Sequence, residues 1–278
     1  MKKGVKKALY YILLLWILTI MCYPIIWLFF SSFKTNTEIF GSNKLLPSSF
    51  SLRPYIEGWK GVGNISYGTF FKNTFLMVIP TVFFTVLSSS VVAYGFARFR
   101  FPLKRVFFAL MLSTLMLPDT VIIIPKYMLF RDFKWLNTYL PFIVPTVFAA
   151  TPFFIFMLVQ FFRGLPRELD ESAVIDGCGS LRIFFSILMP LCKPALISAA
   201  IFQFIWTWND FFSSLIYITE VRKFTLSLAL RMSSDVQSAT SWDKTLAMSV
   251  LTIIPPVMIF FFAQKYFVEG ISTTGIKG

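Results

Sequence analysis

Residues 163–190 read RGLPRELDESAVIDGCGSLRIFFSILMP, and this central loop is the longest soluble-looking segment with a membrane-length apolar run on each side. Pro166 suits the first turn of a helix, because its missing N–H group would have no partner there. The acidic residues that follow, from Glu168 to Glu171, lie near the partially positive end of such a helix. The sequence therefore predicts that a short helix begins near Pro166.

Two glycines further along the central loop offer an end to this helix. Gly177 or Gly179 can adopt the left-handed conformation that commonly follows a helix. Ser180 then suits the N-cap of a second helix over residues 181–189, which Pro190 limits. The loop is predicted to hold two short helices that meet at a glycine.

The composition places the rest of the chain in a membrane. Of 278 residues, 56% are hydrophobic and only 14% are charged, and 35 are phenylalanine. The formal charge of +13 comes from lysines and arginines in short clusters beside apolar runs, as expected for residues that flank membrane spans. We therefore expect a multi-pass membrane protein in contact with lipid, and we exclude nucleic acid as a partner.

Several kinds of chemistry lack their usual residues. The chain has no histidine, and its three cysteines form no CxxC pair, so neither a metal site nor histidine-based catalysis is expected. It also contains no G-x-x-x-x-G-K-[ST] phosphate-binding loop. If ATP drives this protein, another subunit must hydrolyse it.

The apolar runs predict an all-α integral membrane protein with six transmembrane helices in a single domain over residues 1–278. The predicted spans cover about residues 8–30, 74–97, 106–125, 138–162, 194–218 and 246–263. Four lysines precede the first span, and four basic residues lie between Arg98 and Arg105 after the second. Because such clusters stay on the cytoplasmic side, both termini and the central loop are predicted to be cytoplasmic.

The central loop carries a motif of known spacing. Glu171-Ser172-Ala173 is followed by three residues, Gly177, nine residues and then Ile187-Leu188-Met189-Pro190. This pattern resembles the EAA loop of ABC importer permeases, written E-A-A-x3-G-x9-I-x-L-P. Ser172 and Met189 depart from it, but both changes are small or conserve volume.

The resemblance extends over nearly the whole chain. The segments WNDF at residues 208–211 and YFVEG at residues 266–270 are similar to those of the carbohydrate branch of these permeases, above all the six-span maltose-permease-G type. The resemblance implies a permease subunit, not an enzyme, in a bacterial cytoplasmic membrane. It also implies a homologous second permease, two ATPase subunits that hold ATP and Mg, an external solute-binding protein and a sugar substrate, with no cofactor in this chain.

The same resemblance implies the residues that transmit ATP hydrolysis. A coupling helix in the cytoplasmic loop between the fourth and fifth spans would contact the ATPase through Glu171, Ser172, Ala173, Asp176, Gly177, Ile187 and Pro190. The C-terminal Lys277 and Gly278 resemble a tail that reaches into the ATPase dimer. A frayed chain end is the alternative for this tail.

Two carboxylates lie inside apolar runs and must face protein, water or a partner, because an ionised group costs several kcal/mol in lipid. Asp119 and Asp210, together with Gln203 and Asn209, could bind sugar hydroxyls along a translocation path, and Trp206 or Trp208 could offer its ring to a sugar face. The alternative is a structural polar contact between helices.

Two other classes of protein remain possible from the residues alone. An ion-coupled secondary transporter would use Asp119 and Asp210, and it would need neither an ATPase nor a docking helix. A membrane-embedded enzyme would need clustered catalytic groups, and the scattered acidic residues argue against it.

Overall fold

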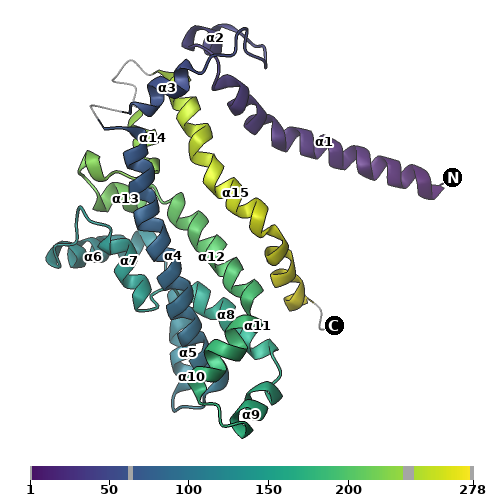
Figure 1. Ribbon diagram of the computed structural model, residues 1–278, viewed down its shortest axis with the longest axis vertical. Coiled ribbons are helices and arrows are strands. Elements are labelled where there is room, and N and C mark those ends of the chain that lie inside the picture. The colour runs from purple at the N-terminus through teal and green to yellow at the C-terminus, as the bar shows by residue number, and fades with distance from the viewer. Residues whose placement is uncertain (1, 62–64, 234–240, 276–278) are drawn as a thin grey trace. The chain divides into compact units, whose positions relative to one another are not determined.

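The computed structural model describes residues 2–61, 65–233 and 241–275, which fold into helices joined by turns (Figure 1). The chain divides into two compact units, one formed by Met1–Phe70 with Leu228–Pro255 and the other by Phe71–Ser227 with Pro256–Gly278. We call them unit 1 and unit 2. The single transmembrane domain expected from the sequence stays a prediction.

Unit 1 contains the first part of the chain and a segment from near its end. Its helices are α1 (Lys2–Ser31), α2 (Asn36–Gly41), α3 (Arg53–Trp59), the start of α4 (Tyr67–Arg98), most of α14 (Leu226–Ser233) and the first part of α15 (Trp242–Gly275). Glu57 of α3 lies 2.6 Å from Arg53 and 3.0 Å from Lys244. Hydrogen bonds from these two cations lower the pKa of Glu57 to about 2, so this link between α3 and α15 persists at neutral pH.

Unit 2 contains the central loop and the helices around it. These are most of α4, α5 (Lys104–Thr114), α6 (Asp119–Asp132), α7 (Leu140–Val147), α8 (Pro152–Gly164), α9 (Glu168–Ile175), α10 (Ser180–Ile183), a π-helix (Phe184–Leu188), α11 (Met189–Leu191), α12 (Lys193–Trp208), α13 (Phe212–Tyr217), a 3-10 turn (Val221–Lys223) and the end of α15.

Four of the six predicted spans correspond to helical segments that are long and apolar enough to cross a membrane. They are Lys6–Ser31, Tyr67–Arg98, Leu140–Gly164 and Trp242–Lys265. A fifth segment qualifies only if Ser180–Leu191 and Lys193–Trp208, which meet at a bend of 78°, count as one span. The described residues thus provide four or five such segments, and the count of six stays a prediction.

The predicted third span, over residues 106–125, is divided into two helices. α5 has 11 residues and α6 has 14, so each is shorter than a membrane-spanning helix. Pro118 explains the division, because proline lacks an N–H group and disfavours helical backbone in the residue before it. Pro118 has extended backbone and lies directly before α6.

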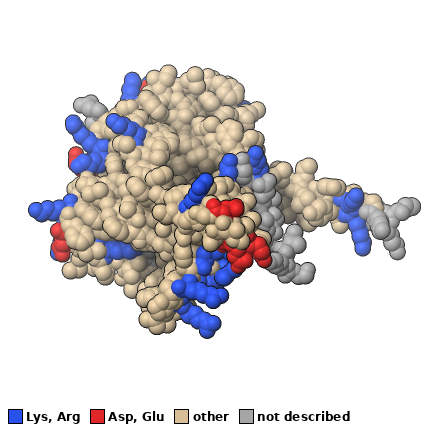
Figure 2. Space-filling model, turned by 60° about the horizontal axis from the view of Figure 1, so that its bottom comes forward, with Lys and Arg blue, Asp and Glu red and all other residues tan. Residues whose placement is uncertain are grey.

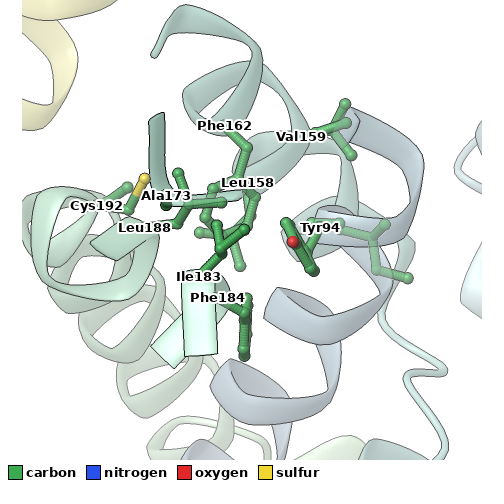
Figure 3. Close-up of a cluster of buried hydrophobic side chains, with 13 residues drawn as sticks. Tyr94, Leu158, Val159, Phe162, Ala173, Ile183, Phe184, Leu188 and Cys192 are labelled. Atoms are coloured by element: carbon green, nitrogen blue, oxygen red, sulfur yellow. The ribbon is translucent and has the colours of Figure 1, made fainter. Parts of the chain in front are cut away.

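The core of unit 2 forms where α8 packs against α4 and the central loop. α8 contributes Ile155, Leu158, Val159 and Phe162, which recur at helical spacing and are each at most 4% exposed. Ala93 and Ala97 of α4 belong to the same cluster, and such small residues let helices approach closely. This cluster supports the central loop from within unit 2 (Figure 3).

Candidate functional site

The start of α9 is bound to the end of α4 by one arginine. Arg98, at the last position of α4, places its Nε 2.7 Å from Oδ2 of Asp170. Its two terminal nitrogens each donate to the carbonyl oxygen of Leu165 at 3.2 Å. The side chain of Arg98 is only 7% exposed and that of Asp170 is 20% exposed, so this ion pair is largely shielded from water. It fixes where α9 begins.

The end of α9 is formed by Gly177, one of the two glycines that the sequence offered for this role. Gly177 has a φ of +77°, in the left-handed region that favours glycine. Its N–H donates to Val174 O at 3.0 Å, and the N–H of Cys178 donates to Ala173 O at 2.9 Å. These bonds satisfy carbonyl groups that a helix end leaves open. An ideal Cβ on Gly177 would have no atom within 4 Å, so the glycine is required by the backbone and not by crowding.

One face of α9 packs in the core of unit 2, and most of its other residues are exposed. Ala173 is 5% exposed and packs in the same cluster as Phe162, Ile183 and Leu188 (Figure 3). The exposed residues of α9 and its cap include Glu168, Glu171, Ser172, Val174, Ile175 and Asp176. Figure 2 turns the end of Figure 1 that carries α9 toward the viewer and shows acidic side chains there with basic ones beside them. α9 therefore presents a mixed acidic and apolar surface.

The second helix of the central loop differs from the prediction. Gly179, with extended backbone, holds the N-cap position, and Ser180 is the first helical residue rather than the cap. Pro190 does not end the helix either, since it lies inside α11. Residues Phe184–Leu188 before it form a π-helix, in which Met189 N–H reaches back to Phe184 O. The wider turn lets the helix continue through Pro190, which has no N–H group to donate to a preceding carbonyl.

The remaining predicted residues of the central loop lie along this second segment. Ile187 is half-buried at the edge of the core cluster and Pro190 is exposed. Lys277 and Gly278 of the predicted tail lie outside the described residues.

Sequence reasoning missed the residues that position the loop. The sequence indicated Arg98 only as part of a basic cluster that sets the membrane orientation, and it gave no role to Tyr94. In the structure, Tyr94 donates from its hydroxyl to Ser180 O at 3.2 Å, and its ring centroid lies 5.1 Å from that of Phe184. Neither contact can be predicted from a local sequence pattern, because each joins residues far apart in the sequence.

A second group of predicted residues lines a pocket at the end of α12. Trp206, Asn209 and Asp210 lie there together, in a cavity of about 500 Å³. The other lining residues are Ile123, Lys126, Ile205, Phe212, Ser213 and Tyr217. This volume is typical of sites for small molecules, and the lining combines an aromatic ring, an amide, a carboxylate and an ammonium group.

Internal contacts orient the polar residues of this pocket. Asp210 accepts from Ser213 N–H at 3.0 Å at the start of α13, and Asn209 donates to Ile205 O at 2.8 Å. Trp206 is 48% exposed, and Phe153 and Phe154 of α8 hold its ring at centroid distances of 5.0 and 5.2 Å. The indole is thus supported by α8 while about half of its surface remains accessible.

Gln203 and Trp208, two of the predicted path residues, do not line this pocket, and Trp208 is only 3% exposed. Gln203 is 9% exposed, does not line the pocket, and donates to Thr207 Oγ1 at 2.8 Å. Asp119 is the first residue of α6, and the placement of its side chain lies outside what the structure describes.

Known proteins are similar to this chain over most of its length. The family described as "Binding-protein-dependent transport system inner membrane component" matches residues 86–273. The arabinooligosaccharides transport system permease protein AraQ of Halalkalibacterium halodurans is 34% identical, over 96% of this chain and 98% of its own length. The diacetylchitobiose uptake system permease protein NgcG of Streptomyces coelicolor is 32% identical, over 94% of this chain and 85% of its own.

The fold is also found in a solved structure. A crystal structure of a bacterial ABC transporter involved in the import of the acidic polysaccharide alginate contains a chain that matches with a TM-score of 0.85. It covers 96% of this chain and 98% of that one, at 22% identity. The comparisons give no support to an ion-coupled carrier. The chain belongs to the binding-protein-dependent transport system inner membrane components, the permease subunits of ABC importers.

Proposed function

We propose that this permease forms half of a translocation path for an oligosaccharide or related sugar, delivered by an external solute-binding protein. The observation that carries the proposal is the pocket in which Trp206, Asn209 and Asp210 meet. Asn209 and Asp210 offer hydrogen-bonding groups for sugar hydroxyls, and the half-exposed indole of Trp206 offers an apolar surface for a sugar ring. The names of AraQ and NgcG, which refer to oligosaccharide transport, support a sugar as the substrate class.

The other half of the path would come from a homologous second permease, and two ATPase subunits would bind ATP and Mg. In this proposal α9 is the coupling helix, and its exposed surface docks on an ATPase subunit. Support comes from the motif around Glu171 and Gly177 and from the exposure of Val174 and Ile175, which are 61% and 85% exposed. Closure of the ATPase dimer would move α9 with the core cluster that holds Ala173, and so change access to the path. The tail through Lys277 would add a second contact.

Trp206→Ala is expected to lower the rate of sugar uptake by reconstituted importer by roughly tenfold at limiting substrate, because it removes the ring surface while Asn209 and Asp210 remain. Trp206→Phe should retain most of the activity. Trp16→Ala is a matched control, since Trp16 is 62% exposed and belongs to α1 of unit 1. Uptake would be measured with the binding protein loaded with arabinooligosaccharide or diacetylchitobiose. If Trp206→Ala transports each sugar like the parent, the pocket does not contact substrate.

The proposed orientation, with six spans and both termini in the cytoplasm, is tested with a native thiol. Cys178 follows Gly177 and is partly exposed, so the Cys22→Ala, Cys192→Ala variant leaves one cysteine in the central loop. An impermeant thiol reagent is expected to label it in inside-out vesicles but not in intact cells. Labelling from outside intact cells would overturn the orientation.

A further inference from the structure

Five basic side chains gather near the turn between α4 and α5. Arg100 lies in this turn, Lys104 and Arg105 begin α5, Arg163 lies near the end of α8, and Arg167 directly precedes α9. Among the described residues, no carboxylate lies within ion-pair distance of any of them; Asp170 pairs with Arg98 instead. This part of unit 2 therefore carries positive charge that the described residues leave uncompensated.

The positive charges are close enough to affect one another. Burial lowers the pKa of the Lys104 ammonium group, and the positive charges of Arg163, Arg167 and Arg100 lower it further. The Lys104 side chain is also held in place: Nζ donates to Phe99 O at 2.7 Å and lies 6.0 Å from the centre of the Phe101 ring. Two of its three N–H donors remain for another acceptor. An anion bound here would relieve this mutual repulsion.

The turn itself forms a pocket of about 400 Å³, lined by Arg100, Phe101, Leu103, Lys104 and Arg105. Leu103 has a φ of +58°, an unusual conformation for this residue type. Its left-handed backbone bends the chain directly before α5. The first N–H groups of α5 have no partner within the helix and add to the positive potential. We call this pocket, with its five lining residues, the basic pocket.

Apolar side chains border the basic pocket. Phe99 is 43% exposed, Val106 50% and Phe107 51%, and Leu103 within the pocket is 64% exposed. Exposed phenylalanine and leucine next to arginine and lysine are typical of a segment at a membrane interface, where apolar groups enter the acyl region and cations meet headgroups. A site for a soluble anion has no need of this apolar border.

We propose that the basic pocket binds the phosphate of an anionic phospholipid, with Arg100, Lys104 and Arg105 as its ligands. The three side chains supply several N–H donors around one cavity. A guanidinium group can donate two parallel hydrogen bonds to two oxygens of one phosphate. Arg163 lies 5.2 Å from the centre of the Phe108 ring of α5, and its charge reinforces the site from α8. A lipid held here would contact the segment that joins α4, whose Arg98 positions α9, to α5.

The assembled importer, purified in detergent, allows a direct test by native mass spectrometry during titration with phosphatidylglycerol. Each neutralised cation is expected to weaken binding about fivefold, so Arg100→Gln, Lys104→Gln, Arg105→Gln should weaken it on the order of a hundredfold. Lys60→Gln, Arg131→Gln, Lys134→Gln removes the same charge from exposed residues elsewhere and should bind like the parent. Arg100→Lys, Arg105→Lys keeps the charge and should retain most of the affinity. If the triple variant does not assemble, Arg105→Gln alone should show the fivefold loss.

Other outcomes identify other partners. The triple variant binding phosphatidylglycerol like the parent would overturn the proposal, as would equal binding of phosphatidylcholine by the parent. Displacement of the lipid by millimolar inorganic phosphate would indicate a soluble anion as the occupant. Loss of the ATPase subunit with unchanged lipid binding would show that these cations serve a protein contact. None of these results depends on which sugar is carried.

Discussion

Gly177→Val is expected to release the ATPase from an otherwise assembled permease pair and to abolish ATP-driven transport. Gly177 has a φ of +77°, and a residue with a Cβ loses about 1 kcal/mol or more in this conformation, with β-branched residues at the greatest disadvantage. No atom lies within 4 Å of an added Cβ. The strain therefore comes from the backbone, and it is relieved by a change in how α9 ends. Co-purification of the ATPase and coupled hydrolysis measure the effect.

The neighbouring glycine offers a matched control. Gly179 also has open space around an added Cβ, but its φ is −73°, which any residue can adopt. Gly179→Val should therefore disturb the turn far less. Gly177→Asn should also be tolerated, because asparagine enters the left-handed region more readily than valine. Retention of the ATPase and of coupled transport by Gly177→Val would show that α9 is not the coupling helix.

Arg98→Met is expected to destabilise the permease by about 3 kcal/mol and to detach α9 from α4. The substitution leaves the carboxylate of Asp170 without its partner and the Leu165 carbonyl without two donors. Breaking a buried ion pair costs about 3 to 5 kcal/mol, and the 20% exposure of Asp170 argues for the lower end. Thermal unfolding of the purified permease pair measures the loss of stability, and ATPase binding reports on α9.

A double-mutant cycle separates the ion pair from the rest. Asp170→Asn removes the charge that Arg98→Met leaves unpaired, so the double variant should lose less stability than the sum of the single variants. Arg131→Met, at an exposed arginine of α6, controls for the loss of an arginine side chain. Additive losses would mean that Arg98 acts through the backbone carbonyls of Leu165 and Pro166 and not through Asp170.

The parts of the site that sequence reasoning found are those set by local rules. Gly177 was predictable because the end of a helix needs a left-handed residue, and the apolar runs around the central loop were predictable from composition. The contacts of Arg98 with Asp170 and Leu165 were not predictable, since they join α4 to the start of α9, which only the tertiary fold brings together. The same holds for the contact between Tyr94 and Ser180.

Proline marked two places where the prediction and the structure differ. A run of apolar residues over 106–125 reads as one span by hydropathy, but Pro118 divides it into α5 and α6. Pro190 was expected to stop a helix and instead lies inside α11, after a π-helix. Composition over a window cannot distinguish a helix that breaks at proline from one that widens around it.

The polar residues of the pocket were predicted in part. Trp206, Asn209 and Asp210 were predicted together and line it, but Gln203, on the same helix as Trp206, does not.

The π-helix has a consequence for insertions and deletions. It contains one more residue per turn than an α-helix, and it lies between α9 and α12 in the chain. Removing one residue from Phe184–Leu188 would restore α-helical spacing with little rotation of the helix beyond, because five π-helical residues make about one turn, as about four α-helical residues do. α12 would then keep nearly the same orientation relative to α10, and Trp206 would still face its pocket. A one-residue deletion within α12 would instead rotate everything beyond it by about 100° and shift it by about 1.5 Å along the axis, so the π-helix is the turn of this segment that should best tolerate the loss of a residue.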